Sequence, residues 1–173
     1  MKNKFLFPII LLSLVFCFVI FYKGLDDSNT YIPQKYVGKK IPFFIAKDLY
    51  SQIEISSEKI FEEDKFYILN IWASWCLPCK KEHSILMELA SNKEVKLIGL
   101  NYKDNISNAK KFIDELGNPY SQILIDSQGT LSVEWGAYGV PETFVIDKEK
   151  KIIKKIIGPL NKVLLKEIKL YLK

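Results

Sequence analysis

The chain has 173 residues, of which 49% are hydrophobic and 26% charged, a composition typical of a globular protein and not of a disordered one. This length holds one domain with a substantial core plus a short extra segment. All 25 basic residues are lysine, the net charge is +5, and no basic run is interleaved with aromatic residues. The sequence therefore gives little support for nucleic-acid binding, and we expect no nucleic-acid partner.

The N-terminal segment has the pattern of a membrane-targeting signal. Lys2 and Lys4 precede an apolar run over residues 5–22, which is short for a bilayer span but longer than the apolar core of a cleaved signal peptide. No small-x-small cleavage pattern follows, and Cys17 lacks the preceding small residue that a lipoprotein signal requires. We therefore expect residues 1–22 to be an uncleaved signal anchor, with a cleaved signal peptide as the alternative. Because lysines stay on the cytoplasmic side, we expect a single-pass protein of a bacterial inner membrane with its C-terminal domain in the periplasm.

A linker and the first elements of the folded domain follow the apolar run. Residues 23–40 are polar and interrupted by glycine and proline, which predicts a linker. The folded domain is then expected over residues 41–173. A strand is predicted within residues 41–50, and residues 53–61 fit either a strand or a short helix.

The central part of the chain alternates strands and helices. Two near-continuous apolar runs, residues 66–72 and 95–102, are typical of strands buried on both faces. The other predicted elements are helices over 77–90 and 106–116, a strand over 122–126, a helical turn over 131–135, paired strands over 143–147 and 151–157, and a final helix from Pro159 or Asn161. In that last helix the residues expected to face the core are Val163, Leu164, Ile168 and Leu172. This order predicts an α/β fold with a mixed sheet and helices on both faces.

Cys76 and Cys79 form a Cys-x-x-Cys pair at the junction between the predicted strand over 66–72 and the helix over 77–90. A pair at such a junction is typical of a redox site. The free N–H groups and the dipole of a helix N-terminus favour a thiolate, so Cys76 is the expected nucleophile. Cys79 lies one turn further along, within reach to resolve a mixed disulfide. A purely structural disulfide is disfavoured because so small a loop gains little stability.

His83 is the only histidine, and it extends the cysteine pair to Cys-x-x-Cys-x-x-x-His. Three potential ligands with no second pair do not make a closed structural zinc site. We therefore expect no metal, and we interpret His83 as a surface or helix-face residue. The redox-active disulfide itself needs no cofactor, and we expect none.

The run Trp-Cys-x-Pro-Cys at Trp75 to Cys79, with Val140 and Pro141 before a later strand, resembles the thioredoxin fold. The resemblance implies that Pro141 is a cis-proline facing the cysteines. It also implies that the backbone of Val140 pairs with an incoming peptide beside Cys76. An ordinary trans proline in a turn is the alternative. We expect the ring of Trp75 to shield the thiols.

The likeness narrows to the DsbE/CcmG family of membrane-anchored thiol:disulfide interchange proteins of cytochrome c biogenesis. The stretches that carry it are residues 70–83, 101–104, 138–144 and 146–147. The resemblance implies a reductase that keeps the haem-binding cysteines of apocytochrome c reduced, directly or through an accessory maturation protein. It also implies electrons from a membrane thiol reductase of the DsbD/CcdA type, and exchange by Cys76 attack followed by Cys79 resolution.

Asn70 stands six residues before Cys76, where thioredoxins carry a buried aspartate that manages the proton of the second cysteine. An asparagine takes no proton, so that role falls to another carboxylate where it is needed. Glu82 and Glu142 lie in the matching stretches, and a nearby carboxylate raises thiol pKa values. We leave open whether one of them tunes the thiols or both are solvated surface glutamates.

Other functions remain as alternatives at this point. The nearest is a thioredoxin-like reductase with another extracytoplasmic client, such as a copper-site assembly or sporulation protein. A membrane-anchored copper chaperone usually separates its cysteines by three residues and adds a distant histidine, which this chain lacks. A peroxidase of related fold is disfavoured because its proline-threonine-cysteine constellation is missing. A thiol-independent binding module would be favoured if a form without Cys76 and Cys79 still supported cytochrome c assembly.

Overall fold

The computed structural model describes residues 6–26 and 36–172, and the chain divides into two units, residues 1–32 and 33–173. In the first unit, helix α1 spans Leu6–Asp26, and its side chains from residue 7 to residue 23 are exposed. Among the residues that the structure describes, no helix has both the length and the apolar character needed to cross a membrane.

The predicted boundaries of the N-terminal segments need correction. Helix α1 continues past residue 22, while Lys2, Lys4 and residues 27–35 lie outside the described residues. Residues 36–40 are part of the folded domain and not of a linker. The backbone N–H of Gly38 donates to the carbonyl of Ile152 at 2.7 Å, and further backbone bonds join this segment to the final hairpin. These hydrogen bonds hold residues 36–40 against the hairpin of β6 and β7, and they satisfy the backbone N–H and carbonyl groups of both segments.

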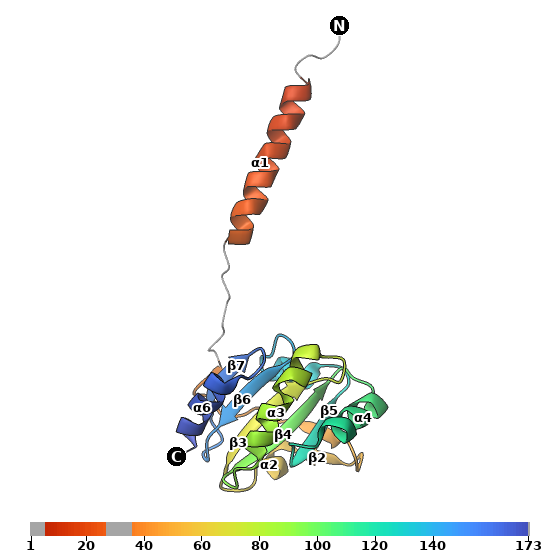
Figure 1. Ribbon diagram of the computed structural model, residues 1–173, viewed down its shortest axis with the longest axis vertical. Helices are drawn as coiled ribbons and strands as arrows, with labels where there is room; N and C mark the ends of the chain where they lie inside the picture. Colours follow the sequence, from red (N-terminus) through yellow and green to blue (C-terminus); the bar gives the residue numbers. More distant parts are fainter. Residues whose placement is uncertain (1–5, 27–35, 173) are drawn as a thin grey trace. The chain divides into compact units, whose positions relative to one another are not determined.

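Seven strands form one mixed sheet in the order β2-β1-β5-β4-β3-β6-β7 (Figure 1). The strands are β1 Ile45–Asp48, β2 Glu54–Ser56, β3 Phe66–Trp72, β4 Val95–Tyr102, β5 Gln122–Asp126, β6 Glu142–Ile146 and β7 Ile152–Ile157. Strands β3, β4 and β5 run parallel, whereas β6 pairs antiparallel with β3 and β7 antiparallel with β6. The apolar runs that predicted two doubly buried strands form the adjacent strands β3 and β4, whose residues are buried along most of their length.

Helices cover both faces of this sheet, as predicted. They are α2 Ser57–Ile60, α3 Leu77–Ala90, α4 Ile106–Leu116, α5 Thr130–Glu134 and α6 Lys162–Tyr171. Helices α3, α4 and α6 pack on one face, and α3 and α6 are seen there side by side (Figure 1). The second face is covered by α2, by Trp135 at the end of α5, and by the segment that leads into β1. The fold is the predicted mixed α/β sandwich.

Local sequence signals set the helix ends. Asn105 and Asn161 cap α4 and α6, and each side-chain oxygen accepts hydrogen bonds from the N–H groups two and three residues ahead. Gly117 ends α4 with a φ of 88°, a conformation that glycine adopts without steric cost. The ambiguous segment over residues 53–61 contains both predicted elements, because Ser56 ends β2 and caps α2.

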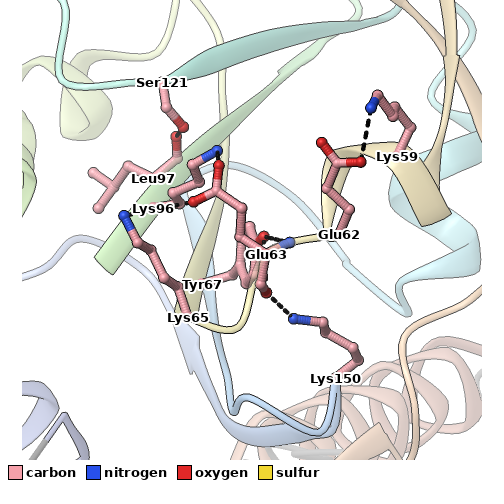
Figure 2. A network of polar contacts seen from close by, with 9 residues as sticks. All are labelled: Lys59, Glu62, Glu63, Lys65, Tyr67, Lys96, Leu97, Ser121 and Lys150. Atoms are coloured by element: carbon pink, nitrogen blue, oxygen red, sulfur yellow. Dashed lines mark hydrogen bonds and ion pairs between the residues drawn. The ribbon is translucent and has the colours of Figure 1, made fainter. Parts of the chain in front are cut away.

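A network around Glu63 ties the end of the sheet that lies away from the cysteines (Figure 2). The Glu63 carboxylate pairs with Lys96 and lies 3.5 Å from Lys65, and its hydrogen bond with Lys96 lowers the pKa of Glu63. Tyr67 Oη accepts from the Glu63 N–H at 2.9 Å, while Lys150 donates to the Glu63 carbonyl. These contacts join the loop before β3 to β4 and to the turn before β7.

Candidate active site

Cys76 and Cys79 form a disulfide at the junction between β3 and α3, with 5.3 Å between their Cα atoms. Cys76 is the N-cap of α3, and its Sγ accepts a hydrogen bond from the Cys79 N–H at 3.1 Å. In the reduced protein, that N–H and the helix N-terminus would stabilise a thiolate on Cys76. Both cysteines are buried, whereas the flanking Trp75 and Leu77 are exposed. The exposed side chains of Trp75 and Leu77 therefore form part of the surface around the buried disulfide.

The segment before Cys76 is bound to the loop that follows β4. The Asp104 carboxylate accepts hydrogen bonds from Ser74 N at 2.5 Å, from Ser74 Oγ at 2.7 Å and from Asn101 Nδ2 at 3.0 Å. Trp75 Nε1 donates to the Lys103 carbonyl at 3.1 Å, and the residue remains 58% exposed. Asp104 belongs to a stretch that carried the family likeness, but sequence reasoning assigned it no role at the cysteine pair. Its role is to hold the segment that leads to the reactive disulfide.

Glu82 lies one helical turn after Cys79 on α3 and is completely buried. Its Oε1 accepts a hydrogen bond from Asn70 Nδ2 at 3.0 Å, and its Oε2 accepts one from Leu160 N at 2.6 Å. Burial raises the pKa of Glu82 to about 7, although both hydrogen bonds favour the ionised form and act in the opposite direction. The alternative of a solvated surface glutamate is therefore wrong for Glu82. The carboxyl group is poised to change its protonation state near neutral pH.

Asn70 connects Glu82 to two other buried groups. Tyr120 Oη donates to Asn70 Oδ1 at 2.8 Å, and Asn70 Nδ2 also donates to Thr143 Oγ1 at 3.1 Å. Burial raises the pKa of Tyr120 well above its ordinary value, so its hydroxyl keeps its proton and always donates. This fixes the amide of Asn70 with its NH₂ group toward Glu82. Asn70 thus stands at the position where thioredoxins carry an aspartate, and its side chain binds the carboxyl group of a different residue, Glu82.

Glu142 begins β6 and is also buried, so the surface alternative is wrong for this residue too. Its Oε1 accepts hydrogen bonds from Tyr138 N at 2.6 Å and from Gly139 N at 3.1 Å. Its Oε2 receives no hydrogen bond of good geometry but lies 2.9 Å from Lys155 Nζ as an ion pair. In the described part of the chain, the polar contacts of Glu142 go to the loop that precedes β6 and to Lys155. A direct action of Glu142 on the thiols stays a prediction.

Lys155 carries a buried charge that sequence reasoning missed. Neighbouring residues of a strand point to opposite faces, so of the pair Lys154 and Lys155 in β7, one must face the side of the sheet that α6 covers and the other the opposite side. That alternation was the signal that could have found it. Lys155 is the buried member, with 2% of its side chain exposed.

The peptide bond between Val140 and Pro141 is cis, as the likeness to thioredoxins predicted. Val140 packs against the buried residues on both faces of the sheet, including the cluster that contains both cysteines. Glu142 pairs with Ile71 near the end of β3, so the loop before β6 and the segment leading to Cys76 lie at the same end of the sheet. The pairing of Val140 with a client peptide stays a prediction.

His83 lies on the face of α3 that meets α4 and is buried there, so of the two predicted alternatives the surface residue is wrong and the helix-face residue is right. Its Nε2 lies 2.9 Å from the Gly117 carbonyl, and its ring meets Phe112 edge-on at 5.3 Å. Burial lowers the pKa of His83 because the charged ring would lose its hydration. Within residues 6–26 and 36–172, no three histidine, cysteine or acidic side chains are grouped so that they could hold a metal ion.

Comparison with known proteins gives consistent results. The redoxin family model matches residues 36–169. The thiol:disulfide interchange protein DsbE of Vibrio cholerae is 39% identical over 165 residues, which cover 93% of this chain and 89% of that protein. The thiol:disulfide interchange protein CycY of Rhizobium leguminosarum is 44% identical over 103 residues, 60% of this chain and 55% of that protein.

Two solved structures are similar along most of the folded domain. A thiol:disulfide interchange protein DsbE from Chlorobium tepidum has a TM-score of 0.69 at 21% identity, covering 79% of this chain and 98% of that one. StoA from Bacillus subtilis has a TM-score of 0.57 at 29% identity, covering 75% of this chain and 97% of that one. The likeness to the Chlorobium protein establishes the fold.

Proposed function

We propose a reducing role in cytochrome c maturation for this chain, which belongs to the DsbE family of thiol:disulfide interchange proteins within the redoxins and is a thiol:disulfide oxidoreductase. One observation carries the proposal. The disulfide between Cys76 and Cys79 sits at the N-terminus of α3, and the buried carboxyl of Glu82 lies one turn behind it on the same helix. This arrangement supplies a nucleophile, a resolving thiol and a proton acceptor.

The exchange runs in two balanced steps. The Cys76 thiolate attacks one sulfur of a client disulfide, forming a bond between Cys76 and the client while the other client sulfur leaves as a thiolate. The Cys79 thiolate then attacks the Cys76 sulfur, forming the intramolecular disulfide and releasing the second client thiolate. Two electrons thus pass from the protein, whose two thiolates become a disulfide, to the client, whose disulfide becomes two thiolates that then take up protons.

Glu82 is our candidate for accepting the proton that Cys79 loses before it attacks. A base whose pKa lies near the working pH is the most effective for this purpose, and the pKa of Glu82 is raised to about 7. Glu142 is the weaker of the two candidates because the charge of Lys155 stands 2.9 Å from it. An opposite charge so close offsets the effect of the Glu142 carboxylate on the thiols.

Family membership supports a proposal for the client and for the electron donor. We propose that the client is apocytochrome c, at the cysteines that bind haem, or an accessory maturation protein. The electron donor is a membrane thiol reductase of the DsbD/CcdA type, which would reduce the disulfide between Cys76 and Cys79 after each turnover. The match to DsbE and CycY proteins supports this choice over another extracytoplasmic client.

The location is part of the same proposal. Lys2 and Lys4 precede the apolar run over residues 5–22, and the apolar side chains of α1 that the structure describes are exposed. We propose that this segment anchors the chain in the bacterial inner membrane with the folded domain in the periplasm. Alkaline extraction of membranes tests the anchor, and protease treatment of spheroplasts tests the side. Release of the intact chain by alkali would contradict the anchor.

The decisive experiment traps the intermediate on a client. We would mix the reduced Cys79→Ser chain with an oxidised synthetic peptide containing Cys-x-x-Cys-His, and in both variants of the test the free and exposed Cys17 is also replaced by serine. We expect a covalent adduct through Cys76 that dithiothreitol releases, detected by intact mass, because the resolving thiol is missing. The matched Cys76→Ser chain should form none. Adducts on Cys79 alone would reverse the assigned roles, and no adduct on either variant would contradict a reductase for such peptides.

A further inference from the structure

A buried charged pair lies under the loop that precedes β6. We name residues 136–141 the proline loop, since Pro141 is its last residue. Lys155 on β7 and Glu142 at the start of β6 have side chains that are 2% and 1% exposed, with 2.9 Å between Nζ and Oε2. The register places Lys155 opposite Phe144, two residues from Glu142 along β6. Both side chains therefore project from the same face of the sheet.

Each member of the pair also binds the backbone of the proline loop. Lys155 Nζ donates to the Gly136 carbonyl at 2.7 Å, at the beginning of the loop. Glu142 Oε1 accepts from the Tyr138 and Gly139 N–H groups in its middle. Lys155 Nζ also lies 4.5 Å from the centroid of the Tyr138 ring, within the range of a cation–π contact. The pair thus holds the loop at three backbone positions.

The two adjacent lysines of β7, Lys154 and Lys155, have different surroundings. Lys154 points to the other face and pairs with Glu167 of α6, where both side chains are partly exposed. Lys155 instead lies beside Phe144 on the face of the sheet opposite α6, where an aliphatic side chain would pack without losing hydration. The two charges contact each other and the backbone of the loop, so the pair connects β6 and β7 to the loop.

We propose that Lys155, acting through Glu142, is a positioning residue that holds the proline loop in the shape that receives a client peptide beside Cys76. This inference rests on the proposed function. It adds that the buried ion pair of Lys155 and Glu142 determines the reactivity of the protein with peptide disulfides. Val140 in this loop packs against the cluster containing both cysteines. The loop therefore contributes to binding of a peptide backbone, whereas a small disulfide needs only access to the Cys76 sulfur.

The test compares two disulfides as oxidants of the reduced full chain carrying Cys17→Ser, which removes the exposed free thiol of α1 from the reaction. One is the oxidised Cys-x-x-Cys-His peptide, and the other is the small disulfide dithionitrobenzoic acid. For Lys155→Met we expect the second-order rate constant with the peptide to fall about ten- to a hundredfold, since small misplacements of binding groups have effects of that size. The rate with the small disulfide and the reduction potential should stay unchanged. Lys154→Met is the matched control and should react like the wild type with both.

Conservative variants keep the test decisive where Lys155→Met does not fold. Lys155→Arg keeps the charge and should restore most of the peptide rate. Glu142→Gln keeps an oxygen for the loop N–H groups but removes the ion pair, and it should lose peptide reactivity selectively. Equal losses with both disulfides, or unchanged peptide rates in folded variants, would overturn the inference. Failure of the wild type to reduce the peptide would instead remove the proposed function, and the inference with it.

Discussion

The buried carboxyl of Glu82 makes a quantitative prediction about stability. Its pKa rises from the ordinary 4.5 to about 7 in the folded protein. Each pKa unit corresponds to about 1.4 kcal/mol. Ionisation of Glu82 in the folded state therefore lowers the free energy of unfolding by about 3 kcal/mol. Because the folded pKa is the higher one, this stability is fully present below pH 4.5 and is lost as the pH rises through 7.

Replacement by glutamine removes the titration. The glutamine side chain of Glu82→Gln has one oxygen, which can accept from only one of the two donors, Leu160 N–H and Asn70 Nδ2. Its NH₂ group faces the other donor, and the hydrogen bond lost there costs about 1 kcal/mol. The variant should therefore be less stable than the wild type by about 1 kcal/mol at low pH, and more stable by about 2 kcal/mol at a pH well above 7, because it carries no buried charge. The two curves of unfolding free energy against pH should cross.

Urea unfolding of the oxidised full chain at a series of pH values measures both curves, and the crossing appears in their difference. Glu88→Gln is the matched control, since Glu88 lies on the same helix with its side chain 55% exposed beside Lys169. That variant should follow the wild type at every pH to within about 1 kcal/mol. Parallel curves for Glu82→Gln and the wild type from low pH to above 7 would refute the buried ionisation.

Three further predictions concern other buried or bonded groups. The ring of His83, the only histidine, should titrate below 6.5 in a proton NMR experiment, so its contribution to stability is present above 6.5 and is lost as the pH falls; a pKa at or above 6.5 would contradict its burial. Asp104→Ala should lower the free energy of urea unfolding by about 1 to 3 kcal/mol because Ser74 loses its acceptor, whereas the exposed Asp114→Ala should not; a change as small as that of the control would show that this acceptor is dispensable. Lys155→Met should cost about 3 to 5 kcal/mol by leaving a buried carboxylate unpaired, and a loss as small as that of a surface lysine would indicate that Glu142 finds another partner.

Local patterns predicted the elements that frame the site. The strand over residues 66–72 and the helix over residues 77–90 have the predicted bounds, because a continuous apolar run ends at a Cys-x-x-Cys motif whose first cysteine caps the helix. The reactive pair could be predicted from sequence for the same reason. The strand, the helix and the cysteine pair each depend on residues close together in the chain, so the local sequence pattern is enough to predict them.

Features that depend on distant residues could not be predicted in this way. Tyr120 fixes the amide of Asn70 from 50 residues away, and Leu160 reaches Glu82 across 78. Nothing in the local pattern of any of them signals the contact. Of the four residues expected on the inward face of α6, Val163 was misjudged, since it is 74% exposed. Ile168 and Leu172 are buried as predicted, and the unassigned Leu165 is buried too.

The reduction potential of the disulfide between Cys76 and Cys79 tests the central claim most directly. Equilibrating the protein with a series of dithiothreitol or glutathione buffers, and reading the oxidised fraction after acid quenching and thiol alkylation, gives the value. A reductant of client disulfides should lie near thioredoxin, at roughly −270 mV or not far above it. A potential near roughly −120 mV is that of a strong oxidant, and it would contradict the reducing role in favour of disulfide formation.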